Sequence, residues 1–152
     1  MGNQQFLLIV LSVIIIGIAI AAGLQIQHVQ AVSSHRQIMI SRMNDLLFQA
    51  IAYWKTPAVQ GGGGGSFVGF TPAGAVDSDH VASNSPGAVK LLEEDANYFI
   101  EWYFNDRLKI IASSKLFGEG NYWNNTYNAR IVAVFDKNGN VDANGFQISG
   151  NW

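Results

Sequence analysis

The sequence predicts an α+β protein, with a long N-terminal α-helical spine over about residues 3–55 and a small C-terminal antiparallel β-sheet of about four strands. Three observations lead to this fold class. Residues 1–24 are almost wholly apolar, residues 25–56 place apolar and polar side chains at helical spacing, and short apolar runs separated by turn residues fill the C-terminal part. A chain of 152 residues has room for one domain of ordinary size.

Composition argues against several classes of function. The chain has 9 Lys and Arg against 11 Asp and Glu, and the basic residues are scattered, so we expect no nucleic-acid partner. It has no cysteine, which removes disulfides, thiolate nucleophiles and cysteine-based metal sites. No Ser/His/Asp arrangement has a recognisable local context, so we expect neither an enzyme nor a cofactor.

Residues 6–24, FLLIVLSVIIIGIAIAAGL, form an apolar run that only Ser12, Gly17 and Gly23 interrupt. At about 1.5 Å per residue, a helix of this length comes close to crossing the ~30 Å hydrocarbon core of a bilayer. A helix that is apolar on all sides must be buried in lipid or in protein. The candidate helix-packing residues are Phe6, Leu7, Leu8, Ile9, Val10, Leu11, Val13, Ile14, Ile15, Ile16, Ile18 and Ile20.

Three interpretations of this segment compete. A cleaved secretory signal is usually shorter and has a basic start, whereas residues 1–5, MGNQQ, hold no Lys or Arg. A single-pass membrane anchor needs only the apolar run. The third interpretation is a helix that begins in the membrane and continues beyond it as part of the folded protein.

The helix is expected to continue past the apolar run, because no Pro or Gly occurs in residues 25–54. Pro57 disfavours helix at the residue before it, so the helix should end near Lys55 and Thr56. Residues 25–56 are amphipathic. Their apolar stripe consists of Val32, Met39, Met43, Leu46, Ala50 and Tyr53, widened by Ile40, Leu47, Ile51 and Trp54.

An apolar stretch that runs into an amphipathic helix and then a small β-rich domain resembles the type IV pilin superfamily, which includes pilins, pseudopilins and archaeal relatives. The resemblance covers residues 1–55 in architecture. It implies a structural subunit of a type IV pilus-like extracellular filament, or fimbrium, that self-assembles through its apolar helix in adhesion, attachment or motility. It also implies insertion in the inner membrane before assembly, help from pilus assembly machinery, and a final place at the cell surface.

The sequence departs from bacterial pilins near its start. Those pilins usually carry Glu at the fifth mature position, whereas this chain has Gln5, or Leu7 if Met1 and Gly2 are removed, and its first acidic residue is Asp45. It also lacks a basic leader and the C-terminal cysteine pair. Two alternatives therefore stay open: a pseudopilin of a secretion system, and a monomeric single-pass protein that tethers an extracytoplasmic binding domain.

Gly17 and Gly23 have two interpretations. The resemblance implies that such a region melts on assembly, and glycine does lower helix stability by about 1 kcal/mol relative to alanine. Alternatively, small residues let neighbouring helices approach closely, as in membrane bundles. The sequence favours neither.

The five consecutive glycines Gly61–Gly65 are the clearest boundary signal in the chain, within a Gly-rich loop region over residues 57–85. A phosphate-binding Walker loop would end in Gly-Lys-Ser/Thr, whereas Ser66 and Phe67 follow here. We therefore expect a flexible hinge or a surface loop.

Residues 86–152 are predicted to form the globular β-rich domain. Ser85 as N-cap and Pro86 at the first helical position predict a short helix over residues 86–95. Strands are expected over residues 98–103, 108–114, 129–135 and 145–149. The predicted core residues are Met43, Leu47, Trp54, Trp102, Ile110, Val132 and Val134.

Two candidate sites lie in this domain, although neither motif is specific. Asp136, Asn138, Asn140 and Asp142 place oxygen atoms at alternate positions, as a calcium loop does, but hairpin turn chemistry explains the same residues. Asn124 begins a glycosylation sequon. The only histidines, His28, His35 and His80, are too few for a structural metal site without further ligands.

Overall fold

The computed structural model describes residues 2–77, 87–103, 106–116, 129–150 and 152. It contains one long helix, α1 (Gly2–Lys55), a 3-10 turn, η1 (Ala58–Gln60), and a six-stranded sheet. The predicted α+β class and the end of the helix at Lys55 are thus confirmed, with two strands more than expected. The chain divides into two compact units, Met1–Gln37 and Ile38–Trp152.

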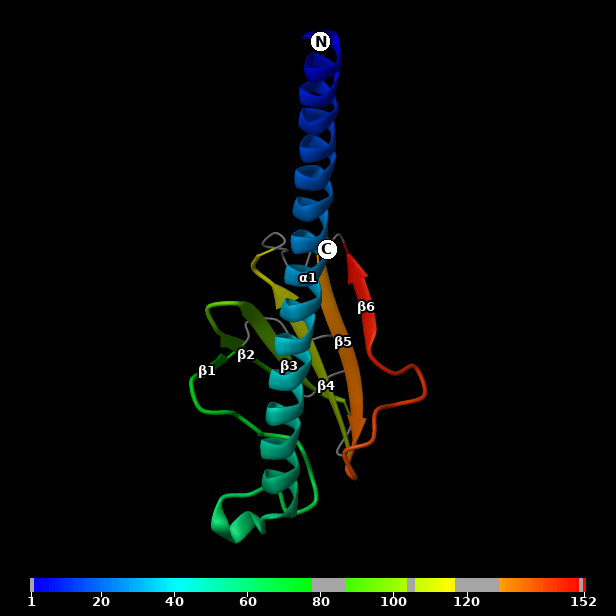
Figure 1. The fold of residues 1–152 in the computed structure, drawn as a ribbon. Helices are drawn as coiled ribbons and strands as arrows, with labels where there is room; N and C mark the ends of the chain where they lie inside the picture. Colours follow the sequence, from blue (N-terminus) through cyan, green and yellow to red (C-terminus); the bar gives the residue numbers. More distant parts are fainter. Residues whose placement is uncertain (1, 78–86, 104–105, 117–128, 151) are drawn as a thin grey trace. The chain divides into compact units, whose positions relative to one another are not determined.

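The sheet is a meander in which each strand pairs antiparallel with the next along the chain (Figure 1). Its longest pairing joins β3 to β4, where Ala96 faces Ser114 and Tyr103 faces Arg107. Antiparallel neighbours need only short connections, which suits the turn-rich sequence between the strands. In chain order the strands are β1 (Ala75–Asp77), β2 (Ala88–Leu92), β3 (Ala96–Tyr103), β4 (Arg107–Ser114), β5 (Ala129–Asp136) and β6 (Gln147–Gly150).

The helix predicted over residues 86–95 is wrong. Residues 88–92 form strand β2, which lies between β1 and β3, and Val89 pairs with Asp77 on one side and Ile100 on the other. Helix-start signals act locally, whereas this segment gains its hydrogen bonds from two neighbouring strands. Ser85 and Pro86, which carried the helix prediction, lie outside the described residues.

The core of the second unit forms between the sheet and residues 38–55 of α1. Five of the six predicted stripe residues are buried, namely Val32, Met39, Met43, Leu46 and Ala50, whereas the sixth, Tyr53, is half-buried. Of the five buried residues, the four from Met39 onward belong to one apolar cluster with the sheet residues Val89, Leu91, Tyr98, Ile100, Leu108, Ile110, Ile131 and Phe135. Tyr98 is buried there, and burial and the nearby Glu93 carboxylate raise the pKa of its hydroxyl.

The predicted core residues divide into three groups. Met43, Leu47 and Ile110 are buried in the core, as expected. Trp54 and Trp102 are half-buried and pack against it. Val132 and Val134 are also half-buried but lie outside the core cluster, because burial in β5 alternates and the buried positions are Ala129, Ile131, Ala133 and Phe135.

The five-glycine run caps the C-terminus of α1. The backbone N–H groups of Gly63, Gly64 and Gly65 donate to the carbonyls of Tyr53, Thr56 and Trp54 at 2.8, 2.9 and 3.0 Å. The last carbonyls of a helix lack partners within the helix, so these bonds satisfy groups that would otherwise face water. The run is therefore a surface loop held by specific hydrogen bonds.

We expect Gly63→Ala to destabilise the second unit by about 2–3 kcal/mol, because a Cβ there would lie 1.9 Å from the Ser66 carbonyl oxygen and force the cap apart. The matched control is Gly61→Asn, since Gly61 has open space around it and a left-handed φ of 82° that Asn tolerates. Denaturant unfolding of the full chain in detergent, followed by tryptophan fluorescence, measures both. Equal costs for the two variants would contradict this account of the cap.

Candidate functional site: the apolar N-terminal segment

The apolar segment, defined as residues 6–24, forms part of α1 and has almost no cover within the described chain. Every residue from Gly2 to Ala22 is exposed. The twelve predicted helix-packing side chains are all exposed, from 42 % for Val10 to 70 % for Phe6. By length and composition α1 is able to cross a membrane.

Ser12 carries the only polar side-chain group of this segment, and that group is satisfied internally. Its Oγ donates to the carbonyl of Leu8, one turn earlier, at 2.8 Å. Burying a hydroxyl in lipid or protein without a hydrogen-bond partner would cost free energy, but the Ser12 hydroxyl finds its acceptor within the same helix. The backbone is likewise paired within the helix, so the segment can leave water without losing a hydrogen bond.

Gly17 and Gly23 both lie in helical conformation inside α1. A Cβ built on either residue would meet nothing within 4 Å, so no contact among the described residues requires glycine there. Gly17 and Ala21 are four residues apart, as are Ala19 and Gly23, and residues at this spacing share a helix face. Such small pairs let helices approach closely in membranes. The two glycines are six residues apart and form no such pair with each other, so the pairs depend on Ala19 and Ala21.

The histidines are not brought together. His28 is exposed and His35 is buried, and seven residues of helix separate them, which corresponds to about 10 Å along the axis. His80 lies outside the described residues, as does Asn124 of the sequon. Within the described ranges, no group of three or more His, Cys, Asp or Glu residues is placed to hold a metal ion.

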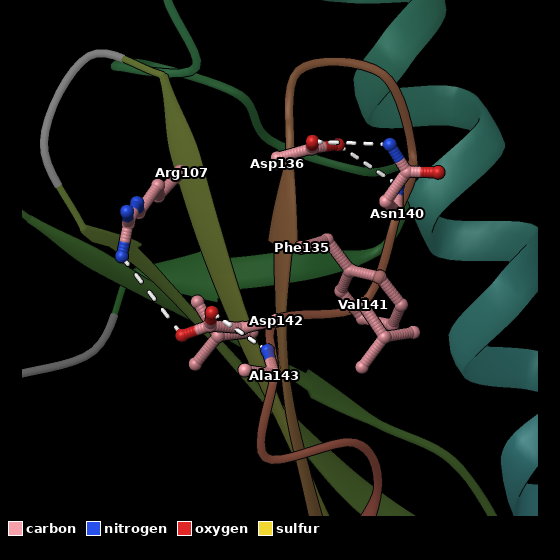
Figure 2. A pocket seen from close by; sticks show the side chains of 8 residues that line it. Arg107, Phe135, Asp136, Asn140, Val141, Asp142 and Ala143 are labelled. Carbon is pink, nitrogen blue, oxygen red and sulfur yellow. Dashed lines mark hydrogen bonds and ion pairs between the residues drawn. The ribbon is translucent and has the colours of Figure 1, made fainter.

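The loop of the calcium candidate, residues 136–142, uses its carboxylates to hold the turn (Figure 2). Oδ1 of Asp136 accepts the backbone N–H groups of Asn138 and Asn140, each at 2.8 Å, and Oδ2 accepts the Asn140 amide at 3.2 Å. Asp142 accepts the N–H of Ala143 and lies 3.9 Å from the Arg107 guanidinium. Turn chemistry thus accounts for these oxygens, and calcium binding stays a prediction.

The Asp136 carboxyl is shifted toward its charged form. Partial burial raises its pKa, but the hydrogen bonds from Asn140 and Asn138 outweigh burial and lower the pKa below its ordinary value. Hydrogen bonds donated to a carboxylate stabilise its ionised state.

Comparison of the chain with protein-family models, with curated proteins and with solved structures finds no match.

Asp136→Ala should lower the free energy of unfolding by about 1 kcal/mol at neutral pH, because the turn loses its acceptor. The folded-state pKa of Asp136 is depressed, so its contribution is present above the unfolded pKa of about 3.9 and is lost as pH falls through the folded value. The difference in free energy of unfolding between wild type and variant should therefore become smaller below about pH 4. Denaturant unfolding at a series of pH values measures it, and a constant difference down to the acid limit would contradict the role of the ionised carboxylate.

Proposed function

We propose that this protein is a structural subunit of a type IV pilus-like extracellular helical filament, which polymerises through its apolar N-terminal helix. The observation that carries the proposal is the exposure of all twelve large apolar side chains between Phe6 and Ile20. Within the described residues, nothing in the chain covers them, so another molecule must.

The size of the hydrophobic term makes this requirement strict. Burying one large apolar side chain contributes about 1.5–3 kcal/mol, so twelve of them represent some tens of kcal/mol. A monomer in water would lose all of it. Lipid supplies the cover before assembly, and copies of the same segment supply it afterward.

Lipid and protein cover differ in what they select for. Lipid tails are as apolar as Leu, so moving a helix from lipid into a bundle gains little from the hydrophobic effect, and close packing must favour the bundle. The Gly17/Ala21 and Ala19/Gly23 pairs provide sites for such packing, and no contact with another part of the chain that the structure describes explains the glycines. This favours a filament over a lone membrane anchor, because an anchor surrounded by lipid does not need small side chains on one face of its helix.

The rest of the chain suits such a subunit. Unit Ile38–Trp152 has its own apolar core between the sheet and residues 38–55 of α1. The apolar segment and residues 38–55 belong to one helix, Gly2–Lys55. The protein would insert in the inner membrane, assemble with the help of pilus machinery, and reach the cell surface in adhesion, attachment or motility.

Ile15→Asp should abolish filament formation, because a carboxylate in an apolar helix bundle is strongly disfavoured. The matched control is Val59→Asp, which places the same acid at a side chain that is 94 % exposed in the second unit. Electron microscopy of sheared cell-surface material counts the filaments, and circular dichroism of the purified chains checks folding. Normal filaments from the Ile15 variant would contradict the proposal, whereas a tethered monomer predicts no filaments from any variant or from wild type.

Two substitutions of Gly17 separate its interpretations. Close packing predicts that Gly17→Leu blocks assembly, although a Cβ at residue 17 meets nothing within 4 Å among the described residues. It also predicts that Gly17→Ala assembles normally. Melting on assembly predicts that Gly17→Ala, which strengthens the helix by about 1 kcal/mol, produces filaments that stretch less under force. Filament yield and single-filament extension measure the two effects. We expect the first pattern, and full assembly of Gly17→Leu would contradict it.

A further inference from the structure

A cavity of about 210 Å³ lies in the second unit where the chain leaves β5 and returns as β6. It contains no residue of the apolar segment. It adjoins the cavity of Figure 2, with which it shares Val134 and Asp142. Its lining includes Lys109, Val132, Val134, Asp142, Asn144 and Gln147.

The apolar wall of this cavity comes from the side of β5 that does not enter the core. Val132 and Val134 are half-buried and alternate with the buried Ile131 and Ala133. Their side chains therefore lie on the opposite face of the sheet from the core. A ligand at this site meets two branched apolar side chains.

The charges around the cavity are already matched. Nζ of Lys109 lies 2.9 Å from Oε2 of Glu101, a carboxylate whose side chain is only 1 % exposed. The Asp142 carboxylate faces the Arg107 guanidinium at 3.9 Å. Because each charge has an opposite partner, the cavity offers no net charge to attract an ion. The buried Glu101 nevertheless fixes the Lys109 ammonium, which has three N–H donors and contacts one acceptor here.

The remaining polar groups are two side-chain amides. Asn144 and Gln147 are exposed, and within the described part of the chain neither side chain makes a hydrogen bond. An amide donates and accepts hydrogen bonds at the same time. Hydroxyl groups do the same, so a pair of amides beside an ammonium is suited to a ligand with several hydroxyls.

We propose that this cavity binds a single neutral polyhydroxylated ring, the chemistry of one sugar residue. The C–H face of the ring packs on Val132 and Val134, while its hydroxyls bond to Asn144, Gln147 and Lys109. The matched charges select against anionic ligands, and the site lies entirely within the unit that carries its own core.

The test is an NMR titration of the full chain, labelled with ¹⁵N, in a zwitterionic detergent that has no sugar head group. The probes are glucose, galactose, mannose and N-acetylglucosamine, with sodium acetate as the anionic control. At least one sugar should cause saturable shifts at the backbone amides of Lys109, Val132, Val134, Asn144 and Gln147, and acetate should cause none.

Two variants locate the binding. Asn144→Ala and Gln147→Ala should each raise the dissociation constant of the sugar about fivefold, the effect of one lost hydrogen bond. Gln49→Ala, at an exposed amide on α1, is the matched control and should leave it unchanged. Unperturbed signals elsewhere in the spectrum show that each variant is folded. The proposal is overturned if none of the sugars gives saturable shifts, if both cavity variants bind like wild type, or if acetate shifts the same residues.

Discussion

An apolar helix surface that no described part of the chain covers imposes the strongest constraint on this protein. Residues 6–24 contain no charge and a single hydroxyl, and that hydroxyl, on Ser12, bonds to the helix itself. The segment can therefore enter lipid or a helix bundle without stranding a polar group. Charged residues begin at Arg36, and most of them belong to the second unit, which builds its own core. The helix Gly2–Lys55 thus has two parts with different needs for cover.

Much of the fold follows from local patterns in the sequence. The helix, its end at Lys55 and four of the six strands have clear periodicity and clear breakers. Strand β2 does not, because residues 88–92 have no strong local preference and are placed by pairing with β1 and β3. The sequence of β5 also does not indicate which of its two faces enters the core. Ile131 and Phe135 are apolar on one face and Val132 and Val134 on the other, and only packing against the helix decides between them.

The candidate site divides in the same way. Continuous hydrophobicity predicts the apolar segment directly, and the structure adds the Ser12 bond and the empty space around Gly17. The role of the five glycines was not predictable from composition, because a flexible hinge and a helix cap use the same residues. The cap depends on the direction of three backbone N–H groups, which composition does not set. The cavity beside Lys109 was not predictable either, because its amides and valines come from segments that only the folded sheet brings together.

The most direct test of the central claim is electron cryomicroscopy of material sheared from cells that express this chain, with mass spectrometry of its N-terminus. The account predicts thin filaments built from this one chain, with residues 6–24 of neighbouring copies packed in a central bundle. Recovery of the protein only as monomers from detergent-extracted membranes would contradict it and would favour a membrane-tethered domain.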